Sequence, residues 1–176
     1  MNERQYHLIN NELILYVKKS PLAIRLFIYL LTVISIVFPF VPIALDFMEH
    51  GEIKAGPVMI GLFLIVIAIY FVRMSLWNTY GAERITFGKE KLEYIADYKW
   101  FKDGAQELEN YTKLYCSYMV LQEKKSSMGR LGFIVKDKAI HCVTKLPLTE
   151  IEEIIEKLSS LEIVSFLDAD DDQNFK

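Results

Sequence analysis

Two long apolar segments constrain this chain more than any other feature of its sequence. Residues 22–45 and 57–77 together contain 45 residues, of which 36 are apolar and only Arg25 and Arg73 are charged. A helix rises about 1.5 Å per residue and must cross roughly 30 Å of hydrocarbon, so about 20 apolar residues form one span. The sequence therefore predicts a transmembrane hairpin. It excludes a disordered chain, a fibrous repeat, a secreted disulfide scaffold and a simple cytosolic enzyme.

Two alternatives to a transmembrane hairpin stay open. A cleaved signal peptide has an apolar stretch of only about 7–15 residues before a small-residue cleavage site. The first segment is longer and ends at residues 38–42, whose two prolines are expected to kink or end a helix. A hairpin buried in a soluble core is the second alternative, although small domains rarely contain two uninterrupted apolar runs of this length.

Lysine and arginine residues near the segments predict how the hairpin is oriented. Four basic residues lie on the N-terminal side, one lies in the link at 46–56, and four lie on the C-terminal side. Because cytoplasmic loops carry the excess of Lys and Arg, both termini are expected in the cytoplasm. Arg25, Arg73 and Trp77 lie just inside the segment ends, where they are expected to anchor the hairpin at the headgroups.

After residue 78 the apolar residues alternate with polar ones, which is typical of strands with one buried face. Residues 84–87 and 91–98 predict a β-hairpin, and the Asp-Gly pair in 100–104 predicts a second turn. Further alternating segments bring the expected number of short antiparallel strands to about six. Residues 124–129 are expected to form a polar loop between two of them.

A helical period closes the folded part of the chain. Thr149 and Glu152 have the spacing of a capping box, which predicts that a helix begins there. Five apolar residues recur at helical spacing on the face that would pack on the sheet: Ile151, Ile154, Ile155, Leu158 and Leu161.

These patterns predict an α+β protein with membrane helices, divided into four parts. A cytoplasmic segment spans residues 1–21 and the transmembrane hairpin spans 22–77. A cytoplasmic domain of antiparallel strands and a closing helix spans 78–163. The acidic tail at 164–176 is expected to be disordered.

Candidate catalytic and metal-binding residues are few in the cytoplasmic part. Cys116 and Cys142 fall in predicted strands and are expected to be free thiols. A zinc site needs at least three protein ligands, and the adjacent His141 and Cys142 point to opposite faces of a strand. No metal or other cofactor is therefore expected. A nucleophile pair between Cys116 and His141 on neighbouring strands stays open as a minor alternative.

One small basic loop is the candidate binding surface of the predicted sheet. Lysine, serine and arginine side chains bind phosphate groups, although a solvated hairpin is the simpler interpretation. Residues 84–145 carry a net charge of +4 and residues 147–166 a net charge of −4, which would orient the domain against an anionic leaflet. Four side chains are candidate contacts for a lipid headgroup or a partner: Lys124, Lys125, Ser126 and Arg130.

The order of these elements resembles a known bacterial group. Trp77-Asn78-Thr79-Tyr80-Gly81, Glu83-Arg84-Ile85-Thr86-Phe87 and Lys91-Leu92-Glu93-Tyr94 follow two N-proximal spans and precede a strand meander with a closing helix. This arrangement, over residues 15–163, resembles the bacterial membrane-anchored pleckstrin-homology-like (YcxB-like) proteins. The resemblance implies a small, strongly bent sheet or barrel capped by a C-terminal helix, in the bacterial inner membrane. The expected six strands are one fewer than the seven usual for pleckstrin-homology folds.

We expect a non-enzymatic inner-membrane protein whose cytosolic pleckstrin-homology-like (PH-like) module binds a protein partner, a second copy or lipid headgroups. The alternative is an immunity-type membrane protein that protects against a delivered toxin. A membrane enzyme acting on lipid would need an acid or base near the interface, and the sequence offers none. Nucleic acid is not expected as a partner, because the pI is about 5.7 and no basic helix is present.

Overall fold

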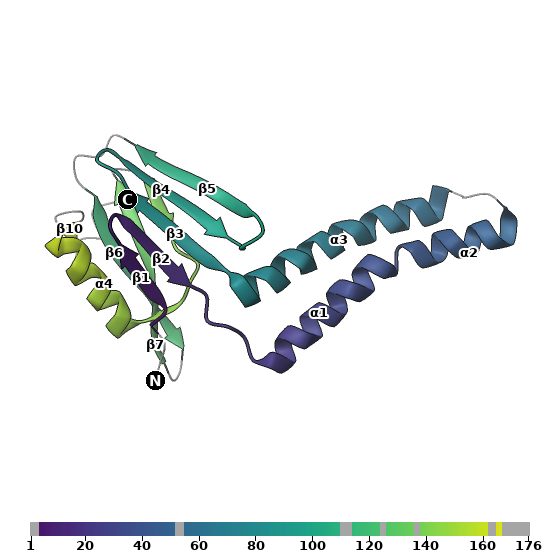
Figure 1. Cartoon of the computed structure of the whole chain (residues 1–176), viewed down its shortest axis with the longest axis horizontal. Coiled ribbons are helices and arrows are strands. Elements are labelled where there is room, and N and C mark those ends of the chain that lie inside the picture. The colour runs from purple at the N-terminus through teal and green to yellow at the C-terminus, as the bar shows by residue number, and fades with distance from the viewer. Residues whose placement is uncertain are drawn as a thin grey trace. The chain divides into compact units, whose positions relative to one another are not determined.

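The chain forms two compact units, one of helices and one of sheets (Figure 1). The helical unit contains residues 19–80, and the sheet unit contains residues 1–18 together with 81–176. The structure, a computed structural model, describes the following residues: 4–51, 55–109, 114–123, 126–135, 138–161 and 165–166.

The helical unit is built from α1 (Leu22–Val37), α2 (Phe40–His50) and α3 (Ala55–Tyr80). Leu22–His50 and Ala55–Tyr80 are long and apolar enough to cross a membrane, each with a mean hydropathy of 2.5 in its most apolar stretch. α1 and α3 pack side by side and run antiparallel (Figure 1). The predicted hairpin of two apolar helices is therefore present, and both helices extend a few residues beyond the expected 22–45 and 57–77.

Proline interrupts the first apolar segment, as the sequence predicts, but does not end it. The N–H of Phe38 donates to the carbonyl oxygen of Ile34 at 2.8 Å, and Pro39 has no N–H with which to continue the ladder. The chain turns helical again at Phe40 and continues to His50. Gly51, with φ of 71°, then adopts the left-handed conformation that commonly ends a helix.

Small residues line the face of α3 that is buried in the helical unit. Gly61, Ala68 and Ser75 recur every seven residues along this face. A side chain at Gly61 would meet Ile43 at 3.3 Å, so glycine allows the two apolar segments to approach closely there. The sequence does not make this seam obvious, because a spacing of seven is less conspicuous than the usual spacing of four.

The sheet unit contains two antiparallel systems of strands. In the first sheet, five strands lie in sequence order: β1 (Tyr6–Ile9), β2 (Glu12–Tyr16), β3 (Ala82–Phe87), β4 (Lys91–Asp97) and β5 (Lys102–Glu109). The second sheet has the order β10 (Ser165–Phe166), β6 (Tyr115–Glu123), β7 (Ser126–Val135) and β8 (Lys138–His141), with β9 (Leu146–Pro147) also paired to β7. The short β10 pairs parallel to β6, and all other pairs are antiparallel.

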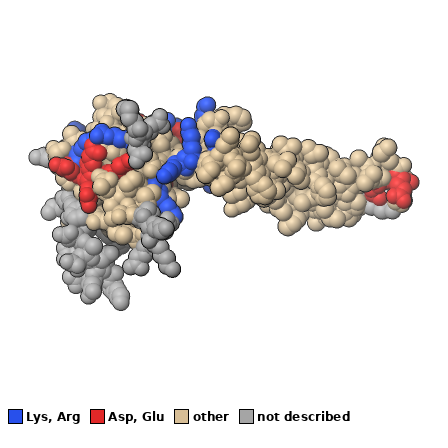
Figure 2. Space-filling model, turned by 90° about the horizontal axis from the view of Figure 1, so that it is seen from below, with Lys and Arg blue, Asp and Glu red and all other residues tan. Residues whose placement is uncertain are grey.

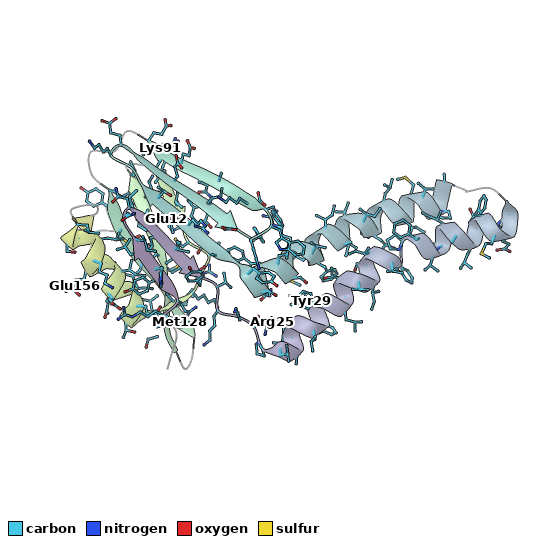
Figure 3. The ribbon with its side chains drawn as sticks, viewed as in Figure 1. Glu12, Arg25, Tyr29, Lys91, Met128 and Glu156 are labelled. Atoms are coloured by element: carbon cyan, nitrogen blue, oxygen red, sulfur yellow. The ribbon has the colours of Figure 1, made fainter. Side chains whose placement is uncertain are left out.

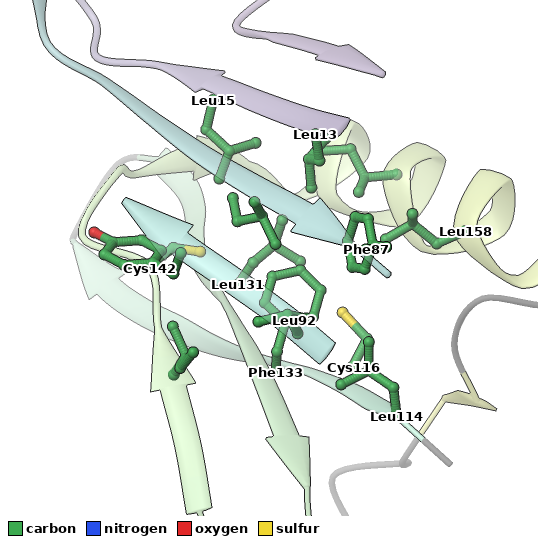
Figure 4. Packing of buried hydrophobic residues seen from close by; sticks show 14 of the residues in the cluster. Leu13, Leu15, Phe87, Leu92, Leu114, Cys116, Leu131, Phe133, Cys142 and Leu158 are labelled. Carbon is green, nitrogen blue, oxygen red and sulfur yellow. The ribbon is translucent and has the colours of Figure 1, made fainter. Parts of the chain in front are cut away.

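One hydrophobic core joins both sheets and α4 (Leu148–Ser160), as Figure 4 shows. The rings of Phe87 and Phe133 meet edge to face, with centroids 5.5 Å apart, and connect the two sheets. The largest fully buried side chains come from all three layers: Leu13, Leu15, Ile85, Leu92, Leu114, Leu131, Phe133, Ile140, Leu146, Ile151, Ile154 and Leu158. The α+β class and the closing helix are thus confirmed.

The N-terminal segment differs most from expectation. We expected residues 1–21 to form a segment separate from the domain at 78–163. Instead, β1 and β2 form a hairpin whose second strand pairs with β3, from Glu12 opposite Thr86 to Tyr16 opposite Ala82. The apolar residues of this hairpin complete the core, so the helical unit is an insertion between β2 and β3.

Three local expectations were also wrong. Residues 126–129 belong to β7 and not to a polar loop. The Asp103–Gly104 pair forms an irregularity within the β4–β5 ladder, where Gly104 has φ of 63°, and not the turn itself. The capping box is absent because α4 already begins at Leu148, which places Thr149 inside the first turn with no side-chain cap. The expected acidic tail lies outside the described residues, apart from 165–166 in β10.

Candidate functional site

The structure describes two of the four residues of the predicted basic loop, Ser126 and Arg130, and both belong to β7. Lys124 and Lys125 lie outside the described residues, and Ser126 begins β7. Arg130 pairs with Met119 in the middle of the β6–β7 ladder. Four residues of extended strand separate Ser126 from Arg130, which is about 13 Å. Arg130 therefore does not belong to the hairpin loop.

The three predicted membrane anchors occupy positions near helix ends. Arg25 lies in the first turn of α1 and is half-buried (Figure 3). Arg73 and Trp77 are four residues apart on α3 and so share one face of that helix. The 26 residues of α3 extend about 39 Å, some 9 Å more than the hydrocarbon layer. Arg73 is about 10 Å from the end of α3.

Hydrogen bonds between side chains connect α1 to α3 inside the helical unit. Thr32 Oγ1 donates to the carbonyl oxygen of Ile28 at 2.8 Å, a common bond for a hydroxyl within a helix, and also lies 3.1 Å from Ser75 Oγ. The hydroxyl of Tyr29 lies 2.6 Å from Thr79 Oγ1. These polar groups thus pair with one another between the helices, where they replace water as hydrogen-bond partners.

Both cysteines are buried, and the structure separates them from the histidine considered as their partner. The side chain of Cys116 is buried in the core. His141 is one register position further along the sheet, so its side chain lies exposed on the opposite face. A Cys116–His141 nucleophile pair is therefore excluded. Burial raises the pKa of Cys116 to about 12, and burial followed by the nearby Glu83 raises the pKa of Cys142 well above its ordinary value. Both thiols are inert as nucleophiles in the folded chain.

The most unusual polar group of the sheet unit is Glu83, a fully buried carboxylate on β3. It accepts three hydrogen bonds: from the Tyr94 hydroxyl at 2.5 Å, from the Val143 N–H at 2.7 Å and from the Thr144 N–H at 2.8 Å. Burial and the adjacent carboxylate raise the pKa of Tyr94, which keeps its hydroxyl a donor. Glu83 is therefore buried with its acceptor capacity used.

The two backbone donors to Glu83 come from the connection between β8 and β9. Both strands pair with β7, where Gly132 is opposite His141 at the end of β8 and Gly129 is opposite Leu146 at the start of β9, and residues 142–145 connect them. Val143 and Thr144 lie in this connection, and the Glu83 carboxylate accepts the hydrogen bonds that a neighbouring strand would otherwise accept from their N–H groups. Glu83 thus connects the first sheet to the second.

Glu83 was not among the residues expected from the sequence, although a signal for it exists. The predicted strand began at Arg84, with Ile85 and Phe87 on the buried face. Extending this alternation back by one step places Glu83 on the same buried face. A buried acidic residue requires partners, but sequence alone does not show that they lie sixty residues away.

Among the described residues of the sheet unit, the turn between β4 and β5 carries the most exposed aromatic side chain. We call residues 98–102 the aromatic turn: Tyr98, Lys99, Trp100, Phe101 and Lys102. Trp100 is 76% exposed, and Phe101 is 39% exposed. An exposed tryptophan at a hairpin tip contributes nothing to the core, which favours a role in contacting something outside the chain.

Local contacts fix the shape of the aromatic turn. The Tyr98 N–H donates to the Phe101 carbonyl at 3.0 Å, and the two rings stack with centroids 4.5 Å apart. The Lys99 N–H donates to Asp97 Oδ1 at 2.7 Å, which supports the positive φ of 74° at Lys99. Trp100 is therefore presented outward by a backbone that is already ordered.

No family model, no curated protein and no solved structure matches this chain. Within the described residues, no group of three or more histidine, cysteine or acidic residues is placed to hold a metal ion. The geometry of the two units is therefore the basis for inferring a function.

Proposed function

We propose that the helical unit anchors this chain in the bacterial inner membrane as a multi-pass hairpin, with both termini in the cytoplasm. The observation that carries the proposal is the exposure of its apolar side chains. Only 17% of the most apolar stretch of Leu22–His50 is buried, and only 11% of that of Ala55–Tyr80. A core helix in a soluble protein is mostly buried, and exposing apolar surface to water costs about 25 cal/mol per Å². A bilayer removes this cost.

The distribution of charge in the helical unit supports the same proposal. Figure 2 shows a surface without Lys, Arg, Asp or Glu over most of the length of the helices, with acidic residues at the α2 end. Asp46 and Glu49 belong to this end. Lipid-facing helices need an apolar exterior and internally satisfied polar groups, and the Thr32–Ser75 contact supplies the second condition. The excess of Lys and Arg on both terminal sides supports cytoplasmic termini.

We further propose that the sheet unit is a PH-like module. If β1, β9 and β10 are additions, the strands β2 to β8 remain, and seven is the number usual for that fold. Two antiparallel sheets closed by a C-terminal helix agree with the architecture implied by the resemblance.

We propose that this module is a binding module without catalytic activity. Its buried reactive groups have structural roles: Glu83 satisfies backbone N–H groups, and the thiols of Cys116 and Cys142 pack in the core. The residues left for interaction lie on its surface, in exposed strands and turns. The occupants that we propose are membrane lipids, a protein partner or a second copy of the chain.

Cysteine accessibility in intact bacterial cells tests the anchor and its orientation. Met48 on α2 is 82% exposed, and Gln106 on β5 is exposed. We expect a membrane-impermeant maleimide to label Met48→Cys in intact cells, and to label Gln106→Cys only after permeabilisation. The native chain serves as the control, because Cys116 and Cys142 are buried and will not react.

The proposed anchor predicts one further result in the same experiment. The chain should remain in the membrane fraction after alkaline extraction, because transmembrane helices are not released by charge changes. Labelling of both engineered cysteines in intact cells would contradict the orientation. Release of the chain into the soluble fraction would contradict the anchor itself.

A further inference from the structure

The aromatic turn lies at the end of the first sheet where the chain leaves for the helical unit. Asp97, which precedes the turn, pairs with Ala82, and Ala82 also pairs with Tyr16. The chain leaves the sheet unit just after Val17 and returns to it at Gly81. The Val17 N–H donates to the Gly81 carbonyl at 3.0 Å, so the points of exit and return lie next to each other. Neighbouring strands are about 4.8 Å apart. The aromatic turn therefore begins on β4, one strand away from the point where the chain returns to the sheet unit in β3.

The chain length between this sheet end and the helices is short. α3 ends at Tyr80, two residues before Ala82, and α1 begins at Leu22, six residues after Tyr16. Because so few residues connect this sheet end to two proposed membrane spans, the length of chain limits how far it can move from the bilayer surface. The aromatic turn therefore has a high effective concentration at that surface and needs little intrinsic affinity to bind it.

The chemistry of the aromatic turn suits a headgroup region. Tryptophan is enriched at membrane interfaces, because its large ring prefers an apolar contact while its N–H still finds a polar partner. Trp100 is 76% exposed at the tip, with exposed Lys99 and Lys102 on either side. Lysine near an anionic leaflet adds electrostatic attraction.

We propose that the aromatic turn inserts into the headgroup region of the bilayer that holds this chain's own helices, with Trp100 as the inserted side chain. The proposal rests on the membrane anchor proposed above. It assigns a lipid surface, and not a soluble protein, as the occupant of this turn. The ordered backbone of the turn lowers the entropic cost of insertion, because Trp100 is already directed outward.

The two tryptophans of the chain allow the insertion and the anchor to be tested separately. Trp77 lies on α3 and Trp100 lies in the aromatic turn, and the sequence contains no others. Trp77→Phe leaves Trp100 as the only reporter, and Trp100→Phe leaves Trp77. The full chain would be reconstituted into anionic vesicles whose lipids carry bromine on the acyl chains near the headgroup, and into matched vesicles without bromine.

We expect bromine to quench most of the emission of both reporters, because Trp100 would lie at the headgroup boundary and Trp77 near the end of a span. Quenching of Trp77 but not of Trp100 would overturn the insertion and leave the anchor standing. Quenching of neither would overturn both proposals. Protection of Trp100 from a water-soluble quencher without bromine quenching would show that protein covers the turn, and would also overturn the insertion.

A charge reversal provides a matched control. Lys102→Glu should reduce bromine quenching of Trp100 in anionic vesicles and leave it nearly unchanged in zwitterionic vesicles, because the lysine acts through the charge of the leaflet. Lys138→Glu makes the same change at an exposed position on β8 and should have no effect. Equal effects of the two substitutions would overturn the role of the aromatic turn.

Discussion

At the scale of single residues, Glu83 shows how a buried charge becomes a structural element. Its carboxylate has no access to solvent, and its three donors come from two different parts of the fold. A buried charge without partners would cost several kcal/mol, whereas this one satisfies two backbone N–H groups in the connection between β8 and β9. Removing it should therefore affect both sheets.

We expect Glu83→Gln to lower the free energy of unfolding by about 2–4 kcal/mol. The amide oxygen of glutamine could still accept the two hydrogen bonds that Oε1 accepts, but its NH₂ group would replace Oε2. The hydrogen bond from the Thr144 N–H would then be lost, and two donors would face each other. Tyr94→Phe, which removes only one donor, should cost about 1 kcal/mol. Alkylation of the buried Cys116 thiol across a urea series, with the full chain in mild detergent, measures both. A cost for Glu83→Gln no larger than for Tyr94→Phe would contradict this role.

Asp97 gives the sheet unit a defined pH dependence. Burial alone would raise its pKa, but hydrogen bonds from the Lys99 N–H and from Arg84, the latter at 2.7 Å, more than offset this and lower the pKa below its ordinary value of 3.8. A carboxyl with a lowered pKa in the folded state contributes stability above its ordinary pKa. This contribution is lost as the pH falls through the lowered value.

Asp97→Asn should therefore destabilise the chain by about 1–2 kcal/mol at neutral pH, since it weakens two hydrogen bonds to a charged group. The difference from the native chain should shrink as the pH falls below the ordinary aspartate pKa, because the unfolded chain then takes up the proton first, and it should vanish once folded Asp97 is protonated at its own lowered pKa. Scanning calorimetry of the full chain in detergent at several pH values measures this difference. A difference that stays constant down to acid pH would contradict the expectation.

At the scale of elements, glycine decides how closely α4 approaches the second sheet. Gly129 on β7 faces the helix, and a Cβ atom there would lie 2.8 Å from Ile151 Cδ1 and 3.0 Å from Leu148 Cδ2. Ile151 is fully buried, and protein cores are close-packed, so a new methyl group there is poorly accommodated. The Gly129-Arg130-Leu131-Gly132 segment, which lacks a phosphate-loop pattern, thus owes its first glycine to packing.

We expect Gly129→Ala to lower the free energy of unfolding by about 1–3 kcal/mol through overpacking. Gly132→Ala is the matched control on the same strand, where the new methyl group would meet the exposed His141 ring at 3.0 Å. This ring can rotate away, so the cost should be smaller. The urea series described for Glu83 compares the two, and an equal cost would argue against close packing between α4 and β7.

At the scale of the whole molecule, the chain interrupts one sheet to insert its helices. β2 and β3 are neighbours in the sheet but are separated in sequence by the helical unit at 19–80. Closing a loop of this length costs entropy, but the cost rises only slowly with length, and the helices order the loop themselves. The N-terminal hairpin is therefore an integral part of the sheet unit.

We expect Leu15→Ala to lower the free energy of unfolding by about 2–4 kcal/mol, because Leu15 on β2 is fully buried. Ile14, the adjacent residue, lies on the opposite face and is half-buried, so Ile14→Ala should cost clearly less. Urea-dependent alkylation of Cys116 reports both, since that thiol lies in the same core. Equal and small effects would show that the N-terminal hairpin is not part of the cooperative unit.

Features that depend only on neighbouring residues could be predicted from the amino-acid sequence. Apolar length and hydropathy predicted the two long helices, alternating apolar residues predicted β3 and most of β4, and a helical period predicted α4. Each of these patterns is local, so it can be read without knowing what packs against it. The function expected from the sequence, including the immunity-type alternative, stays a prediction.

Contacts between distant segments could not be predicted in this way and are seen only in the folded chain. Folding joined residues 6–16 to β3 across the helices, and it brought the N–H groups of Val143 and Thr144 to Glu83. It also placed the aromatic turn beside the points where the chain enters the helical unit. Such contacts arise from strand register and from the satisfaction of buried polar groups, which depend on residues far apart in sequence and so leave no local pattern.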